Sequence, residues 1–273
     1  MKVLVIGGGG RCHAIVDALG RSPRVTKIWC APGNAGIARQ AECVPLRDTD
    51  VEGLLAFARR EGADLTVVGP ESALAAGIVD AFRAAGLRIF GPTQAAARIE
   101  TSKRFAKELM LRYAVPTAAY RVFSDYGEAA DYVRSQPLPA VLKYDGLAAG
   151  KGVVIARTPG EADAALRDML LDDRFGHGQV VVEEFMEGPE VSVLSFTDGE
   201  TVVPMVSSMD HKCALDGDKG PNTGGMGTIA PNPCYTEKIA DECMQTIFLP
   251  TIRAMKAEGR PFKGCLYFGL MLT

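Results

Sequence analysis

The first hundred residues alternate short apolar runs with segments of helical periodicity, and this alternation constrains the fold more than any other feature. Lys2–Ile6 reads as a buried strand, and Arg11–Leu19 follows as a helix with Ile15 and Leu19 on one face. Strand–helix alternation at this spacing predicts an α/β fold with a parallel sheet and right-handed crossovers. Further strands are expected at Thr26–Cys30, Leu65–Val68 and Leu87–Phe90, and further helices at Val51–Arg60 and from Leu74 through Phe82 to Gly86.

The pattern then changes to a smaller α+β arrangement. Ser102–Tyr113 predicts one more helix, and Asp125 and Thr158 each begin a helix with a capping box. Asp210–Gly227 is polar and rich in glycine, which favours a long functional loop. Strands are expected at Tyr120–Phe123, Ala140–Tyr144, Val153–Ala156, Gln179–Phe185, Glu190–Phe196, Thr201–Val206 and Gly264–Met271, and a last helix around Cys243–Ala257.

Composition excludes several classes of partner. The formal net charge is −3, so no global basic field is available to hold nucleic acid or an anionic membrane. The seven cysteines include no C-x-x-C pair, which argues against a zinc site and a disulfide framework. No apolar stretch is long enough to span a bilayer, and the first residues lack a signal-peptide layout. We therefore expect a reduced, cytoplasmic protein that binds small molecules.

The glycine run Gly7–Gly10 lies between a predicted strand and a predicted helix, where backbone N–H groups favour a phosphate. A dinucleotide fingerprint would need a third glycine where Cys12 or His13 stands, and an acid at the end of the second strand. A tight turn without a ligand is a second alternative. We favour a phosphate or phosphosugar, with the loops at 31–36 and 69–71 at the same edge of the sheet.

Two lysines flank a predicted hairpin rich in small residues. Lys143 lies inside an otherwise apolar strand, and Lys151 lies in the loop Gly146–Gly152 that follows it. Small residues let the backbone close over a polyphosphate, to which the lysines supply positive charge. A solvated hairpin is the alternative, but a charge inside an apolar strand is costly without a partner.

The predicted strand Gln179–Phe185 is apolar at first and then carries the carboxylates Glu183 and Glu184, which precede Met186 and Glu190. Backbone atoms around Glu183–Met186 could contact an adenine edge, and Glu190 could accept ribose hydroxyls. By itself this is a weak signal, because acids at a strand end are usually solvated.

The quoted stretches, taken together, resemble one family, the phosphoribosylamine–glycine ligases, also called glycinamide ribonucleotide synthetases. The matching segments run in family order from Met1 to Met271: MKVLVIGGGGRCHA, APGNAG, VGPE, RIFGPT, the Ser102–Lys103 pair, DGLAAGKGV, VVEEFMEG, DHK, GPNTGGMG and LYFGLM. The resemblance implies a Rossmann-like N-terminal domain at 1–102, then an ATP-grasp domain at 103–273 with 120–190 as a mobile lid.

The family joins glycine to 5-phosphoribosylamine with ATP, through glycyl phosphate, in purine biosynthesis. The resemblance implies catalytic roles for Lys143 and Asp210, the latter holding the glycine ammonium. The implied nucleotide-binding residues are Lys103, Lys143, Gly146, Leu147, Ala148, Gly150, Lys151, Gly152, Glu183, Met186 and Glu190. The implied substrate-binding residues are Gly8, Gly9, Gly10, Pro32, Gly33, Asn34, Glu71, Asp210, Gly224, Gly225 and Met226.

Some positions depart from the family pattern. Cys12 replaces a usual glutamate, Tyr144 a small residue and Cys213 a common arginine. The family holds Mg²⁺ (or Mn²⁺) on a strand that reads E-F-N-x-R-x-G-D-P-E, and no such stretch occurs here. Its ligands are therefore expected beyond Thr273, and the 273-residue chain is expected to be inactive alone. Another ATP-grasp carboxylate–amine ligase, or a non-catalytic nucleotide-binding fragment, remains an alternative.

Overall fold

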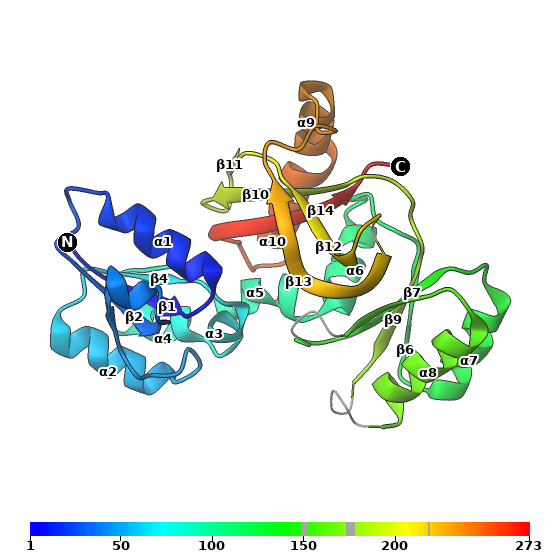
Figure 1. Cartoon of the computed structure of the whole chain (residues 1–273), viewed down its shortest axis with the longest axis horizontal. Helices are drawn as coiled ribbons and strands as arrows, with labels where there is room; N and C mark the ends of the chain where they lie inside the picture. The colour runs from blue at the N-terminus through cyan, green and yellow to red at the C-terminus, as the bar shows by residue number, and fades with distance from the viewer. Residues whose placement is uncertain (149–151, 173–177, 218) are drawn as a thin grey trace. The chain divides into compact units, whose positions relative to one another are not determined.

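The computed structural model describes residues 1–148, 152–172, 178–217 and 219–273 (Figure 1). The chain divides into two compact units. The first comprises Met1–Arg98 with Phe262–Cys265, and the second comprises Ile99–Pro261 with Leu266–Thr273.

The first unit is built on a five-stranded parallel sheet with the strand order β3-β2-β1-β4-β5. The strands are β1 (Lys2–Gly7), β2 (Lys27–Pro32), β3 (Glu42–Cys43), β4 (Leu65–Val68) and β5 (Ile89–Phe90). β1 is in the centre and is buried on both faces, which explains its unbroken apolar sequence. The predicted parallel α/β fold is confirmed for this unit.

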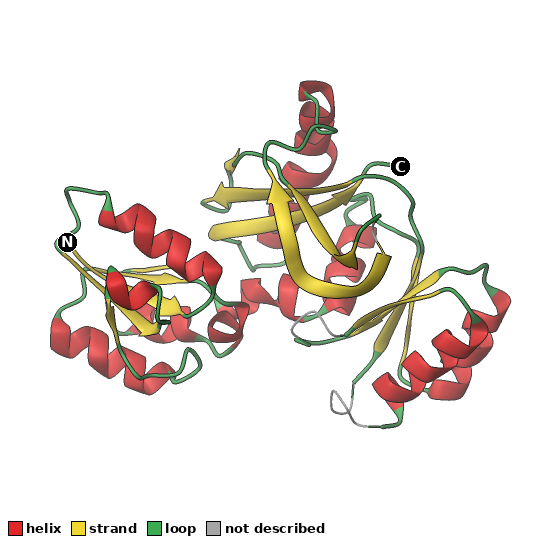
Figure 2. Ribbon diagram, in the orientation of Figure 1, coloured by secondary structure: helices red, strands yellow, loops and turns green. Residues whose placement is uncertain are grey.

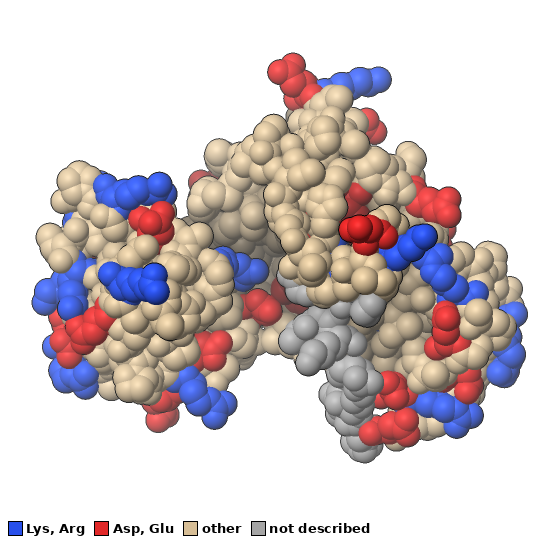
Figure 3. Space-filling model, in the orientation of Figure 1, with Lys and Arg blue, Asp and Glu red and all other residues tan. Residues whose placement is uncertain are grey.

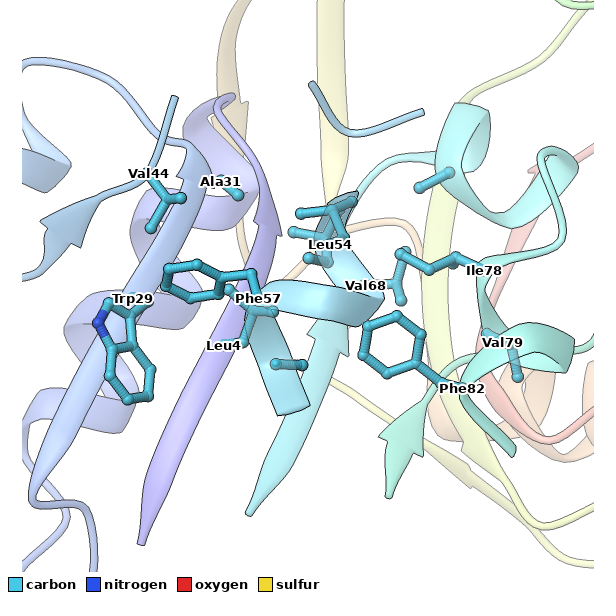
Figure 4. Close-up of a cluster of buried hydrophobic side chains, with 13 residues drawn as sticks. Leu4, Trp29, Ala31, Val44, Leu54, Phe57, Val68, Ile78, Val79 and Phe82 are labelled. Carbon is cyan, nitrogen blue, oxygen red and sulfur yellow. The ribbon is translucent and has the colours of Figure 1, made fainter. Parts of the chain in front are cut away.

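Helices cover both faces of this sheet (Figure 2). On one face Leu4 and Ile6 pack with Phe57 and Phe82 from two helices. Figure 4 shows Leu4, Phe57 and Phe82 in this cluster. On the other face Val3 and Val5 pack against the first helix. The helices are α1 (Gly10–Gly20), the 3₁₀ turn η1 (Ile37–Arg39), α2 (Val51–Glu61), α3 (Glu71–Ala75) and α4 (Ile78–Ala84), after which α5 (Gln94–Thr101) leads into the second unit.

The single helix expected from Leu74 through Phe82 to Gly86 is instead two helices, α3 and α4. Gly77 lies between them with φ of +83°, a left-handed backbone conformation that residues other than glycine rarely adopt. The apolar residues on either side keep helical spacing, so the stripe looked continuous in the sequence. The break lets α3 bury Ala73 and α4 bury Ile78, Val79 and Phe82 as separate helices.

The second unit contains a four-stranded antiparallel sheet with the order β6-β9-β7-β8. Its strands are β6 (Tyr120–Phe123), β7 (Ala140–Tyr144), β8 (Val153–Ala156) and β9 (Val180–Glu184). Helices α7 (Tyr126–Ser135) and α8 (Pro159–Leu170) pack on it around Leu142 and Leu166. Both predicted caps are present: Asp125 accepts from the Glu128 N–H at 2.9 Å, and Thr158 accepts from the Glu161 N–H at 3.2 Å.

A second sheet of this unit has three strands in the order β11-β10-β14. They are β10 (Glu190–Thr197), β11 (Val202–Pro204) and β14 (Gly264–Met271). The remaining helices are α6 (Lys103–Arg112), α9 (Glu237–Cys243), the π-helical turn η2 (Met244–Phe248) and α10 (Leu249–Ala257). Phe248 stacks on Phe268 of β14 at a ring-centroid distance of 4.1 Å. The helix expected around Cys243–Ala257 thus begins earlier and includes a π turn.

The predicted glycine-rich loop Asp210–Gly227 is wrong in one respect, because most of it forms an antiparallel ribbon. β12 (Met209–Leu215) pairs with β13 (Lys219–Ile229), with shifts in register along the way. Figure 1 shows β13 as a long curved strand. Glycine has a low strand propensity, so a glycine-rich strand is difficult to predict from sequence. In the structure, pairing of the two backbones stabilises the ribbon.

Candidate functional site

Two lysines and a glutamate meet inside the second unit. Glu183 of β9 is only 6% exposed, and its Oε2 accepts a hydrogen bond from Lys143 Nζ of β7 at 2.8 Å. Lys107 Nζ of α6 lies 3.3 Å from the same oxygen, and Lys107 is 5% exposed. We call Lys107, Glu183 and Lys143 the Lys–Glu–Lys cluster. Burying these charges is tolerable because they are paired.

Sequence analysis missed Lys107. A signal was present, because Lys103 and Lys107 are four residues apart and therefore share a face of α6. Burial lowers the pKa of Lys107, and the positive charge of Lys143 lowers it further, while Glu183 opposes the shift.

The loop after β7 is fastened to the first turn of α6. Lys103 Nζ donates to the Gly146 carbonyl at 2.9 Å, and the Asp145 carboxylate accepts from the Arg104 N–H at 3.1 Å. Burial lowers the pKa of Lys103, with Asp145 opposing the shift. Gly146 has φ of +157°, and a Cβ there would lie 2.8 Å from the Tyr144 ring. Position 146 therefore requires glycine.

The expected covering loop is only partly described. Leu147 is 45% exposed, and a Cβ at Gly152 would lie 2.7 Å from that of Ala148. Gly150 and Lys151 fall outside the described residues.

A cavity of about 840 Å³ lies between the strand β8, the turn after β9 and the β12–β13 ribbon. Four expected site residues line it, namely Met186, Glu190, Asp210 and Met226. Lys103, Lys143, Gly146 and Glu183 are not among its lining residues. Its volume falls in the range of about 300–1,000 Å³ typical of small-molecule sites.

Glu190 on the cavity wall is held from two sides. Its carboxylate pairs with Lys212, and its carbonyl accepts from Asn232 Nδ2 at 2.9 Å. Burial by itself would lower the pKa of Lys212. The hydrogen bond to Glu190 and its negative charge outweigh that effect, so the pKa of Lys212 is raised. These contacts hold Glu190 in place at the start of β10.

The turn between β9 and β10 is locked to the end of β14. Gly188 has φ of +154°, and a Cβ there would lie 2.0 Å from the Leu272 carbonyl oxygen. The Leu272 N–H also donates to the Pro189 carbonyl at 3.1 Å. This contact fixes the backbone between Met186 and Glu190.

Asp210 lies on β12 opposite Thr228 of β13. A Cβ at Gly225, where φ is +118°, would lie 3.1 Å from Asp210 Oδ1. The ribbon thus places the expected residues Asp210, Gly225 and Met226 along one short stretch, and Gly224 is in the same strand.

In the first unit, three loops meet at the carboxyl edge of the parallel sheet. Asn34 Nδ2 donates to the Gly8 carbonyl at 2.8 Å, and a Cβ at Gly8 would lie 2.5 Å from the Gly33 oxygen. Arg11 donates to the Gly69 carbonyl at 2.7 Å and lies 3.6 Å from the Glu71 carboxylate. The expected residues Gly8, Gly33, Asn34 and Glu71 thus lie in connected loops, with Pro32 ending β2.

The start of α1 is open to an anion. A Cβ at Gly9 or Gly10 would meet nothing within 4 Å, and the first turn of α1 has no acidic residue. Free N–H groups and the helix dipole favour negative charge at such a place. On the face drawn in Figure 3, positive and negative side chains are interspersed, so local donors must select an anion.

The described residues do not supply the ligands that a divalent metal needs. Among them, no group of three or more histidine, cysteine, aspartate or glutamate side chains lies close enough to hold one. A hard cation needs several oxygen ligands. The described part of the chain therefore does not fit a metal ion, and we assign no step to one.

Both units match one family along their whole length. Residues 1–100 match the phosphoribosylglycinamide synthetase N domain, and residues 101–273 match the phosphoribosylglycinamide synthetase ATP-grasp (A) domain. The chain belongs to the phosphoribosylglycinamide synthetase family. The resemblance inferred from the sequence motifs is confirmed, as is the fold of a Rossmann-like part followed by an ATP-grasp part.

Relatives named phosphoribosylamine–glycine ligase cover the entire chain. The proteins from Xylella fastidiosa strain Temecula1 and Neisseria meningitidis serogroup B are 54% and 52% identical to it. The chain spans 64% and 65% of their lengths.

Solved structures agree on the fold. Phosphoribosylamine–glycine ligase from Thermotoga maritima is 31% identical with a TM-score of 0.83, over all of this chain and 66% of its own. An ADP complex of N5-carboxyaminoimidazole ribonucleotide synthetase is 16% identical with a TM-score of 0.73, over all of this chain and 67% of its own. At that identity the second likeness concerns the fold alone. No helix in the described ranges is long and apolar enough to cross a membrane.

Proposed function

We propose that this chain carries the nucleotide- and substrate-binding parts of a ligase that joins glycine to 5-phosphoribosylamine with ATP. The products are glycinamide ribonucleotide, ADP and phosphate. The observation that carries the proposal is the cavity of about 840 Å³, whose walls bring together Met186, Glu190, Asp210 and Met226 from segments that match the family in order.

ATP lies with its base and ribose in this cavity. The backbone around Met186 contacts the adenine edge, and the Glu190 carboxylate, held by Lys212, accepts the ribose hydroxyls. The phosphates extend to Lys143 and Lys103, which supply charge without acceptor atoms. The Glu183 side chain accepts a hydrogen bond from Lys143, so only the backbone of Glu183 contacts the adenine.

The chemistry proposed is phosphoryl transfer to the glycine carboxylate. The carboxylate attacks the γ-phosphate, ADP leaves, and the amine of phosphoribosylamine then displaces phosphate from glycyl phosphate. Such transfer depends on positioning and charge neutralisation more than on an activated nucleophile. Asp210 holds the glycine ammonium beside Gly224, Gly225 and Met226.

The phosphoribosylamine binds in the first unit. Its phosphate lies against the N–H groups of Gly8–Gly10 at the start of α1, and Pro32–Asn34 and Glu71 contact the sugar. Support comes from the open surface at Gly9 and Gly10 and from the Asn34–Gly8 hydrogen bond.

We propose the functional domains as 1–102 and 103–273, with 120–190 as a lid that closes over nucleotide. The compact units and the family matches divide the chain near the same point. The four-stranded sheet with α7 and α8 makes up most of the proposed lid. These elements share a hydrophobic core around Leu142 and Leu166, which supports their movement as one body.

Thermal unfolding with nucleotides tests the proposal. A ligand that binds only the folded state raises the melting temperature. ATP and ADP should raise it, and NAD should not. Ribose 5-phosphate, a stable probe for the phosphosugar site, should raise it independently. Stabilisation by NAD but not by ATP would contradict the proposal and favour a dinucleotide-binding protein.

A further inference from the structure

Among the described residues of the second unit, Lys107 is the most deeply buried charged group that the proposed chemistry does not use. Three oxygen atoms surround its ammonium: Thr117 Oγ1 at 2.8 Å, the Ala118 carbonyl at 3.1 Å and Glu183 Oε2 at 3.3 Å. The Tyr120 ring lies 5.5 Å from it. An ammonium has three N–H donors, so these oxygens account for all of them. Lys107 therefore has no donor left for a ligand.

Lys143 differs from Lys107 in its exposure. Its side chain is 29% exposed, against 7% for Lys107, although both approach the same oxygen of Glu183. Within the described residues, Lys143 Nζ donates to Glu183 Oε2 at 2.8 Å. One side of the cluster is thus closed by the protein, and the other retains access to solvent.

The charges of the cluster do not cancel. Two lysines share a single carboxylate oxygen, which leaves one net positive charge. A simple structural ion pair would need only one lysine, and here the second lysine is the one that keeps access to solvent. Because Glu183 divides its negative charge between both lysines, it only partly neutralises Lys143.

We infer that Lys107 is a positioning residue that acts through Glu183: it keeps that carboxylate from neutralising Lys143 in full and keeps Lys143 Nζ directed toward a nucleotide polyphosphate. Lys107 fixes the Glu183 carboxylate from α6, and that carboxylate fixes Lys143 Nζ on β7. Without the charge of Lys107, Glu183 would neutralise Lys143 and could move toward it. The inference rests on the proposed function, since it needs phosphates to bind at Lys143.

The first test compares ligands with and without phosphates. Lys107→Met removes the charge but keeps an unbranched side chain of similar length. Calorimetry should show ATP affinity lower by about ten-fold, the size expected for one charge-assisted contact, and adenosine affinity changed by less than about two-fold. Lys107→Arg should restore ATP affinity. Lys238→Met, at an exposed lysine of α9, should behave as the wild type.

The outcomes separate the inference from simpler explanations. If Lys107→Met binds ATP as tightly as the wild type, the inference is wrong. An equal loss of ATP and adenosine binding with a lower melting temperature also overturns it, because that result indicates structural support alone. If the wild type binds adenosine but gains nothing from the phosphates, the proposed triphosphate site itself fails, whatever the variants do.

A second measurement does not depend on the Met variant folding. Burial and the nearby charge of Lys143 lower the pKa of Lys107, against the opposing charges of Glu183 and Glu184 and beside the Tyr120 ring. Its positive charge is present below that pKa and is lost as pH rises through it. ATP affinity of the wild type should therefore fall at lower alkaline pH than that of Lys107→Arg, whose guanidinium stays charged beyond about pH 12. Superimposable pH profiles would refute the inference.

Discussion

The side-chain amide of Asn34 donates a hydrogen bond to the carbonyl of Gly8 at 2.8 Å, and so fastens the loop after β2 to the loop after β1. The same side chain accepts from the N–H groups of Gly36 at 2.8 Å and Ile37 at 2.9 Å. One residue therefore holds both loops in shape at the carboxyl edge of the parallel sheet. Next to these loops, a Cβ added at Gly9 or Gly10 would meet nothing within 4 Å, so the surface over these two residues is open.

Replacing Asn34 by alanine should destabilise the first unit. The change removes three hydrogen bonds and should lower the free energy of unfolding by about 1–3 kcal/mol. The chain has one tryptophan, Trp29, which is buried in β2, so its fluorescence in urea reports on this unit. Gln40→Ala, at an exposed position, is the control. Equal urea midpoints for both variants would show that the loops hold their shape without Asn34.

Replacing Lys143 by alanine should weaken ATP binding. The change removes a charge-assisted contact worth about 1.5–3 kcal/mol, which corresponds to about ten-fold or more in affinity. Glu183 keeps Lys107 as a partner, so the fold should persist. Calorimetric titration measures the affinity, with Lys238→Ala as the matched control. Unchanged ATP binding would remove Lys143 from the phosphate site.

ATP should protect the loop after β7 from hydrogen exchange. The loop must open to admit nucleotide and close to exclude water. Amides from Gly146 to Ala148 and at Gly152 should exchange more slowly with ATP, whereas those of α2 in the first unit should not change. Identical exchange with and without ATP would argue against a lid.

Buried thiols should resist alkylation while the protein is folded. Burial raises the pKa of Cys30 to about 12, and the neighbouring Cys12 and Cys43 add to the shift. Burial also raises the pKa of Cys12 and Cys243. Because the thiolate is the reactive form, these three should remain unmodified by iodoacetamide near neutral pH. Peptide mass spectrometry should find label at partly exposed Cys234 and Cys265 first; early labelling of Cys30 would contradict the burial.

The parallel sheet could be predicted from the sequence because each buried strand is continuous and apolar. Five expected strands are confirmed at both ends. One of them, Leu65–Val68, lies in the parallel sheet, and the others are Tyr120–Phe123, Ala140–Tyr144, Val153–Ala156 and Gly264–Met271. The β12–β13 ribbon could not be predicted, because its strand character comes from long pairing and its glycines carry no apolar alternation. The break at Gly77 was hidden by an uninterrupted helical stripe.

The candidate site shows the same division between local and tertiary information. Motif spacing indicated Glu190, Asp210 and Met226, which line one cavity. The spacing of Lys103 and Lys107 places both on one face of α6, but the role of Lys107 depends on Glu183, which is 76 positions away in the sequence and meets it only in the folded chain. The individual roles of the site residues stay predictions until binding is measured.

The closeness of Gly188 to the Leu272 carbonyl has a consequence for how this chain tolerates mutation. Exposed positions usually accept many amino acids, and Gly188 is exposed. Here even a single methyl group would collide with backbone 84 residues further along the chain, so the position is as restrictive as one inside a core. In a survey of random variants, position 188 should retain glycine almost without exception, while the exposed Glu187 beside it drifts freely.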